Sequence, residues 1–155
     1  MTPTCALCEG PAGDAGLFRE QVWGDELWRL SMSVEGYTSG FAYLEPKRHV
    51  PHIEDLDGRE ALTFGPTLAR VSRVLREAAG AERVYVYIFG SGIPHLHVHL
   101  APHREGDALS SAIVRGEVID EPLPSGAHRL ISTEFDELPA AEIRTVIERV
   151  RERLS

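Results

Sequence analysis

Alternating apolar and polar residues in the first third of the chain predict three β-strands. The first two are joined by a turn at Gly24–Asp25, and the third ends at Pro46, because proline cannot donate a ladder hydrogen bond. In the second strand Trp28 and Leu30 fall on one face, which we expect to be buried. The predicted strands are residues 17–23, 26–34 and 41–46.

Two segments with helical spacing of their apolar residues predict amphipathic α-helices. The first covers 59–79 and is followed by Gly80, a residue that favours the left-handed conformation of helix ends. The second begins near Pro139, because proline is favoured at the start of a helix. The apolar stripes are Leu68, Val71, Leu75 and Ala78 in the first helix and Ile143, Val146, Ile147, Val150 and Leu154 in the second.

Two further segments between the helices predict neighbouring antiparallel strands. The sequence RVYVYIF, residues 83–89, is β-branched and aromatic, and HLHVHLA, residues 95–101, follows it after a glycine-rich turn. The region 104–130 is polar and indicates no particular element. This order of elements predicts an α+β fold, an antiparallel sheet with helices packed on one face or at its ends.

Length and charge narrow the class of protein. A chain of 155 residues fits a single domain, 1–155, with an N-terminal segment 1–16 and a C-terminal helix 139–155. The formal charge of −8 argues against a nucleic-acid polymer as partner, because phosphate backbones are bound by basic surfaces. No apolar run approaches the ~18 residues of a membrane span, and no signal-peptide pattern opens the chain, so we expect a cytoplasmic protein that does not bind membranes.

The two cysteines of the chain, Cys5 and Cys8, form a Cys-x-x-Cys motif near the N-terminus. In a cytoplasmic protein this spacing indicates metal binding or redox chemistry more than a structural disulfide. The loop-like sequence that follows favours half of a zinc site over a redox pair or two uninvolved thiols. The missing ligands must come from elsewhere in the chain, and histidine is the obvious supplier.

The stretch GIPHLHVHLAPH, residues 92–103, holds four of the seven histidines of the chain. On a strand, His95, His97 and His99 would share one face, with adjacent Cα atoms ~6.6 Å apart and the outer two ~13 Å apart. An adjacent pair could share a zinc ion, whose nitrogen ligands lie at about 2.0–2.1 Å, but all three could not. The spacing therefore disfavours a three-histidine zinc site from this strand alone.

Phosphoryl or nucleotidyl transfer fits the three histidines better. A neutral imidazole can act as a nucleophile when a hydrogen bond holds its second nitrogen, and neighbouring imidazoles can stabilise charge on a phosphate. We expect His97 to attack phosphorus with His99 beside it. A single histidine on a strand is usually a structural polar residue, but three in alternation favour a functional site.

This pattern resembles the histidine triad (HIT) superfamily. HLHVHLAP is similar to the signature of that family, FAYLEPKRH (41–49) to its strand ending in Pro-Lys-x-His, and HREGD (103–107) to the tail of the motif in its diadenosine-polyphosphate hydrolases. The resemblance spans roughly residues 27–107. It implies a five-stranded antiparallel sheet, usually in a homodimer, and hydrolase or transferase chemistry at the α-phosphate of a small nucleotide or phosphate-ester substrate.

The resemblance also implies roles for individual residues. His97 would be the nucleophile that forms a covalent nucleotidyl intermediate, His99 would contact phosphate oxygens, and His95 would help to order the site. In members with an N-terminal Cys-x-x-Cys, including the galactose-1-phosphate uridylyltransferases, zinc is held by the two cysteines and two histidines. The matching residues here are Cys5, Cys8, His49 and His95. Four protein ligands leave no open position, so the zinc would be structural.

Three features depart from the family pattern. The usual Asn-x-Gly and Gly-Gln turn before the triad is shortened here to FGSGIP, residues 89–94. The aspartate that often binds the ribose hydroxyls is matched by Ser33, and the Ser or Thr three residues before the first triad histidine is matched by Gly92. Ser91 is adjacent and could substitute. The candidate substrate-binding positions are therefore Ser33, Ser91 and Gly92. The departures affect the expected nucleotide substrate more than they affect the expected fold.

Two alternatives to an enzyme with a covalent intermediate remain open. The chain could be a non-catalytic nucleotide-binding or interaction module that retains the triad. It could instead be a zinc-dependent hydrolase with its metal between two triad histidines. Outside the triad we expect His52 and His128 in loops, His103 exposed, and Tyr87 in the core or a dimer interface.

Overall fold

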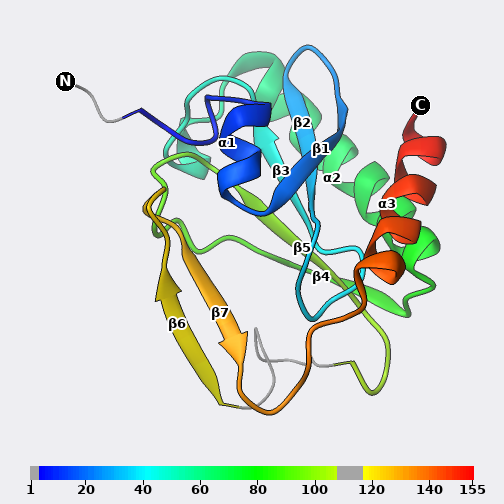
Figure 1. Ribbon diagram of the computed structural model, residues 1–155. Helices are drawn as coiled ribbons and strands as arrows, with labels where there is room; N and C mark the ends of the chain where they lie inside the picture. The colour runs from blue at the N-terminus through cyan, green and yellow to red at the C-terminus, as the bar shows by residue number, and fades with distance from the viewer. Residues whose placement is uncertain (1–3, 108–116) are drawn as a thin grey trace.

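The computed structural model describes residues 4–107 and 117–155 (Figure 1). A five-stranded sheet, a separate two-stranded ribbon and three α-helices make up this part of the chain. The elements are α1 (Pro11–Gly16), β1 (Arg19–Gly24), β2 (Trp28–Ser33), β3 (Ala42–Pro46), the 3₁₀ turn η1 (Ile53–Asp55), α2 (Gly58–Ala79), β4 (Arg83–Tyr87), β5 (Val98–His103), β6 (Val118–Pro122), β7 (His128–Ser132) and α3 (Ala140–Leu154).

The main sheet has the order β1-β2-β3-β5-β4, and all its neighbouring strands are antiparallel. Strands β6 and β7 pair only with each other in the described structure. The α+β architecture and the five-stranded antiparallel sheet implied by the family resemblance are confirmed. None of the helices in the described part of the chain combines the length and apolar content that crossing a membrane requires.

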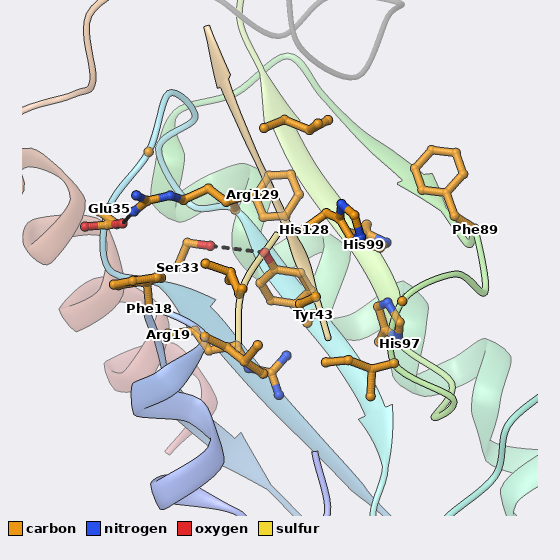
Figure 2. Close-up of a pocket in the computed structure, with 18 of the residues that line it drawn as sticks. Phe18, Arg19, Ser33, Glu35, Tyr43, Phe89, His97, His99, His128 and Arg129 are labelled. Atoms are coloured by element: carbon orange, nitrogen blue, oxygen red, sulfur yellow. Dashed lines mark hydrogen bonds and ion pairs between the residues drawn. The ribbon is translucent and has the colours of Figure 1, made fainter. Parts of the chain in front are cut away.

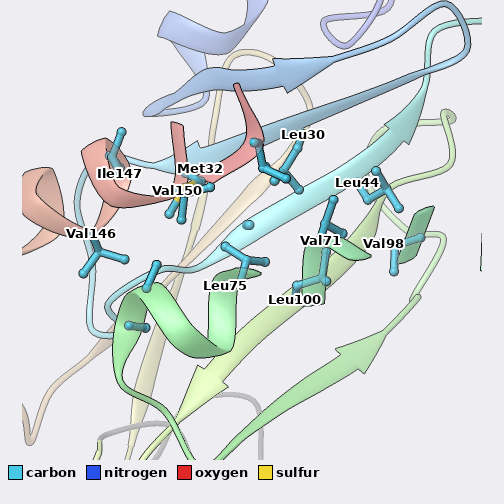
Figure 3. Packing of buried hydrophobic residues seen from close by; sticks show 14 of the residues in the cluster. Leu30, Met32, Leu44, Val71, Leu75, Val98, Leu100, Val146, Ile147 and Val150 are labelled. Carbon is cyan, nitrogen blue, oxygen red and sulfur yellow. The ribbon is translucent and has the colours of Figure 1, made fainter. Parts of the chain in front are cut away.

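The hydrophobic core lies between one face of the sheet and helices α2 and α3 (Figure 3). Register pairs Leu30 with Leu44 and Ala42 with Leu100, so these apolar side chains share that face. The alternate residues of the same strands project to the opposite face, where α1 packs beside β1. The strand alternation seen in the sequence thus separates a core face from a polar face, which carries the functional side chains.

Truncating the core is expected to cost stability in proportion to burial. Leu75 of α2 is fully buried, whereas Leu62 on the same helix is 78% exposed. We expect Leu75→Ala to lower the free energy of unfolding by about 2–5 kcal/mol, because a cavity adds to the lost transfer free energy. Leu62→Ala should change it by less than about 0.5 kcal/mol. Urea denaturation of both variants checks this, and equal effects would contradict the assigned core.

Both long helices agree with their predicted bounds. Helix α2 spans Gly58–Ala79 and ends at Gly80, whose φ of 62° is left-handed, as its position predicts. The C-terminal helix α3 starts at Ala140, with Pro139 as the capping residue just before it.

One prediction about local structure is wrong, and the structure contains two elements that the sequence pattern does not indicate. The triad strand begins at Val98, so His95 and His97 precede it rather than lying on it. The reason is tertiary, since the Leu96 N–H donates to the Val50 carbonyl at 2.6 Å and not to a neighbouring strand. The N-terminal segment contains the short helix α1, and the polar region after β5 contains the ribbon β6–β7. Neither element shows strong apolar periodicity.

Candidate functional site

The structure divides the triad histidines between two places. His97 and His99 line a cavity of about 600 Å³ on the polar face of the sheet. His95 is 1% exposed and lies beside the two cysteines instead. A straight strand would have put all three rings on one face, so the bend before β5 accomplishes the separation.

The cavity has a floor of strand residues and a wall formed by the ribbon (Figure 2). Tyr43, His99 and Tyr87 are register neighbours across β3, β5 and β4, which places their side chains in one row on the floor. Residues of β6, β7 and their connecting turn lie over this row. The ribbon is held there by Arg129, which pairs with Glu35 at 2.6 Å. The polar residues of the wall are Asp120, His128 and Arg129.

The imidazole of His97 is oriented by a hydrogen bond to the backbone. Its Nδ1 lies 2.6 Å from the carbonyl oxygen of His95, so this nitrogen carries the proton and donates it to that bond. The second nitrogen, Nε2, is thereby left with a free lone pair. Within the described residues no hydrogen bond engages Nε2. The carbonyl of His95 therefore orients the imidazole of His97.

His99 is held among aromatic rings. It stacks on Tyr87 with ring centroids 4.8 Å apart and an interplanar angle of 10°, and it meets the edge of Tyr43. Burial lowers the pKa of His99 to about 4, and the neighbouring His97 and Arg19 act in the same direction. His99 is therefore neutral at pH 7. Its Nδ1 and the Tyr87 hydroxyl are buried without hydrogen-bond partners in the described structure, which is unusual for buried polar atoms and suits a polar ligand.

The lowered pKa of His99 predicts a pH-dependent stability. An unfolded histidine binds its proton near pH 6.5, but the folded chain resists it until about pH 4. Between these values the unfolded state holds more protons, so stability is lost as the pH falls. Lowering the pH from 7 to 4.5 should reduce the free energy of unfolding of the unchanged protein. We expect this reduction to be about 2–3 kcal/mol smaller in His99→Gln. Urea denaturation at both pH values checks this, with the exposed His52→Gln as control; equal pH dependence in both variants would contradict the assignment.

All three candidate substrate-binding positions line the same cavity as His97 and His99. The Ser33 Oγ is 3.4 Å from the Tyr43 hydroxyl, so the position matched to the family's aspartate carries a hydroxyl that contacts a second one. Gly92 has a φ of 84°, a backbone conformation that suits glycine, and an added Cβ would lie 3.4 Å from the Gly126 carbonyl oxygen. The turn before the triad and the tip of the ribbon therefore meet at Gly92.

Cys5, Cys8, His49 and His95 form the second cluster. Their ligand atoms all lie within 4.8 Å of one another. The Nδ1 of His95 is 3.5 Å from Cys5 Sγ and 3.4 Å from Cys8 Sγ, and the Nδ1 of His49 is 3.4 Å from Cys8 Sγ. Among the residues that the structure describes, this is the group of three or more potential ligands compact enough for one metal ion.

These distances fit a tetrahedral zinc ion. Zinc–sulfur bonds of about 2.3 Å and zinc–nitrogen bonds of about 2.0–2.1 Å place ligand sulfur and nitrogen about 3.5–3.6 Å apart. The Nε2 of His95 donates to the Pro46 carbonyl at 2.8 Å, which leaves Nδ1 unprotonated and facing the thiols. Metal-bound histidines commonly have such a carbonyl partner on the far nitrogen. The four residues are thus consistent with a zinc site.

Several cavity residues were not identified from the sequence. His128 lies on β7 and not in a loop, and its Nδ1 is 2.7 Å from Asp120. Tyr87 lines the cavity and does not belong to the hydrophobic core of the described residues. Outside the cavity, His103 is half-buried against Tyr85 and not exposed. Arg19 is almost completely buried and also lines the cavity. The sequence does place Arg19 on the polar face of a predicted strand. It does not show that helix α1 would cover that face.

Sequence comparison finds related proteins at modest identity. An uncharacterized HIT-like protein of Mycobacterium tuberculosis is 26% identical over 113 residues, which cover 70% of this chain and 77% of that protein. The AP-4-A phosphorylase of the same species is 28% identical over 114 residues, 70% of this chain but 58% of the relative. The chain thus spans little more than half of that enzyme. No protein-family model matches the sequence.

Solved structures with the same fold cover nearly the whole chain. A histidine triad protein from Bradyrhizobium japonicum superposes with a TM-score of 0.65 at 20% identity, over 91% of this chain and 94% of that one. A Zn-bound histidine triad family protein from Mycobacterium smegmatis superposes with a TM-score of 0.61 at 21% identity, over 96% and 94%. The chain thus has HIT-like sequence relatives and the fold of the histidine triad proteins. The resemblance predicted from the triad is confirmed.

Proposed function

We propose that this chain is a nucleotide hydrolase or nucleotidyltransferase that acts at the α-phosphate of its substrate through a covalent nucleotidyl intermediate on His97. The observation that carries the proposal is the 2.6 Å hydrogen bond from His97 Nδ1 to the His95 carbonyl. This bond leaves Nε2 with a free lone pair, on a side chain that lines the cavity. The similarity to an AP-4-A phosphorylase supports a substrate with a nucleotide phosphate.

The proposed reaction has two displacements at phosphorus. In the first, the Nε2 lone pair of His97 forms an N–P bond while the bond from phosphorus to the leaving-group oxygen breaks, and that oxygen keeps the electron pair. The imidazole keeps its Nδ1 proton, so the developing positive charge is stabilised by the His95 carbonyl. In the second, water or a phosphate oxygen attacks phosphorus, the N–P bond returns its electrons to Nε2, and a proton from attacking water leaves to solvent.

The other cavity residues would bind the substrate. His99, neutral at pH 7 because burial lowers its pKa, would donate a hydrogen bond to a phosphate oxygen. Ser91 and the backbone at Gly92 would contact the phosphate, and Ser33 would contact the sugar. His95 would act through its carbonyl and its place in the metal cluster, as a positioning residue for His97.

We propose that zinc is the metal held by Cys5, Cys8, His49 and His95 and that its role is structural. Zinc supplies a cross-link between segments that are distant in sequence. The four residues use all tetrahedral positions, so no position is left for a substrate oxygen. The shared fold with the Zn-bound histidine triad family protein from M. smegmatis supports this choice of metal.

A substrate panel with alkaline-quench analysis tests the proposed function, because the N–P bond of a nucleotidyl-histidine is stable in base and hydrolyses in acid. The purified protein would be mixed with diadenosine polyphosphates, nucleoside phosphoramidates and sugar nucleotides that carry a radiolabelled α-phosphate. We expect turnover of at least one class and label bound to the protein within the first turnover. Tight nucleotide binding without turnover would favour the non-catalytic module, and failure with every class would contradict the enzyme.

Assembly and location belong to the same proposal. We propose a homodimer, as the family resemblance implies, and a cytoplasmic location, as expected from the sequence. The edge strand β4 and the residues after it expose three apolar side chains, Val86, Ile88 and Phe89, which supports association of two copies. Sedimentation equilibrium should give twice the 17.1 kDa mass of the chain; a monomer at micromolar concentration would contradict it.

A further inference from the structure

Arg19 lies under the cavity at the start of β1. Its side chain is 3% exposed, yet it lines the cavity together with His97 and His99. Its guanidinium carbon is 5.0 Å from the ring centroid of Tyr43, whose ring in turn contacts His99. Figure 2 shows Arg19, Tyr43 and His97 around the same cavity. An arginine so deeply buried is rare unless it is paired or has a ligand.

Two buried carboxylates hold the Arg19 guanidinium in place. Its Nε donates to Asp14 Oδ1 at 2.8 Å, and its Nη2 is 2.6 Å from Glu45 Oε1. Arg29 binds the same two carboxylates, donating to Asp14 at 2.9 and 3.0 Å and lying 3.6 Å from Glu45. Two of the three nitrogens of Arg19 are thus engaged, while Nη1 donates no hydrogen bond within the described residues.

The positive charge of Arg19 affects a triad histidine, His99. Burial is the main cause of the lowered pKa of His99, and the positive charge of Arg19 also contributes. Burial raises the pKa of Glu45 to about 7, against the opposing effect of Arg19 and Arg29. Two arginines, Arg19 and Arg29, thus share two buried carboxylates, and burial favours the neutral form of one of them, Glu45. The other cavity arginine, Arg129, forms ion pairs with Glu35 and Glu121 and stacks on Phe18. Figure 2 shows it on a different side of the cavity from His97.

We propose that Arg19 is a further catalytic residue, whose Nη1 binds a non-bridging oxygen of the phosphoryl group that His97 attacks. This inference rests on the proposed function. Negative charge accumulates on those oxygens as the N–P bond forms, and a cation already held in place stabilises it without reorganisation. The neutral His99 would supply a hydrogen bond but no charge. The substrate class that fits is an anionic phosphate ester or anhydride, not a neutral ester.

A comparison of Arg19 with Arg29 tests this proposal. Both arginines bind Asp14 and Glu45, but Arg29 does not line the cavity, so Arg29→Gln is a matched control for damage to the ion network. We expect Arg19→Gln to slow adduct formation on His97 about 100-fold in single-turnover experiments at saturating substrate. Arg29→Gln should lose comparable thermal stability but keep a rate close to that of the unchanged protein.

Rescue experiments distinguish a lost catalytic interaction of Arg19 from a loss of folding. Arg19→Lys should recover part of the rate, and millimolar guanidinium added to Arg19→Ala should recover part of it as well, whereas Arg29→Ala should not respond. Equal rates in Arg19→Gln and Arg29→Gln, with both variants folded by circular dichroism, would overturn the role of Arg19.

A binding measurement applies even if no nucleotide is turned over. AMP would be titrated and its affinity measured by calorimetry for the unchanged protein, Arg19→Gln and Arg29→Gln. We expect Arg19→Gln to weaken AMP binding by about 10-fold or more, as loss of a charge-assisted hydrogen bond does, and Arg29→Gln to leave it close to unchanged. Equal affinities in the two variants would overturn the inference. Absence of adduct in the unchanged protein would contradict the proposed function alone.

Discussion

Replacing His97 with asparagine is expected to abolish the covalent adduct and to lower turnover by at least about 10³-fold. The amide of asparagine can still donate toward the His95 carbonyl, which His97 Nδ1 contacts at 2.6 Å, but it offers no nucleophilic nitrogen at the position of Nε2. Substrate binding should persist, because His99, Ser91 and Arg19 still line the cavity. Alkaline-quenched labelling measures the adduct, and steady-state kinetics measures turnover.

The matched control for this prediction is His103→Asn. His103 belongs to the same strand as His99 but does not line the cavity, so its loss should leave the adduct in place. An adduct that survives in His97→Asn would show that another residue is the nucleophile. An unchanged turnover without any adduct in the wild-type protein would favour direct attack by water.

The second large effect is expected from the metal cluster. Cys5→Ser removes one ligand of the proposed zinc site, and we expect loss of bound zinc together with about 3 kcal/mol or more of folding stability. For a chain of this size that corresponds to a melting temperature roughly 10 °C lower. The reason is that the cluster joins the N-terminus to the His49 loop and to the segment before β5. Elemental analysis and thermal melting check both parts.

A pair of histidines three residues apart supplies the control. His49→Gln should behave like Cys5→Ser, because the His49 Nδ1 faces Cys8 Sγ at 3.4 Å. His52→Gln, in the same loop but exposed, should keep zinc and stability. If zinc remains bound after both cysteines are replaced, the assignment of the metal site is wrong, and a metal between triad histidines becomes the better explanation.

The sequence by itself determined the elements with strong periodicity and the residue types of the site. Apolar spacing was sufficient for α2 and α3, because amphipathic helices bury one stripe whatever they pack against. The Cys-x-x-Cys motif and the alternating histidines indicated metal and phosphate chemistry, because few other chemistries need those residues at that spacing. The separate role of His95 came from the family resemblance, and spacing argued only that three histidines on a straight strand could not share one zinc ion.

The tertiary structure alone decided how these residues are divided and what surrounds them. His95 turns toward the cysteines because the chain before β5 bonds to the 46–50 loop and not to a strand, a contact that no local pattern encodes. The ribbon β6–β7 forms a cavity wall through long-range contacts that include the ion pair of Arg129 with Glu35, residues 94 positions apart. Arg19 acquired its position from Asp14 and Glu45, on two other elements. Periodicity reports which face of an element is buried, but the partners that hold a charge at a site are set only when distant segments pack together.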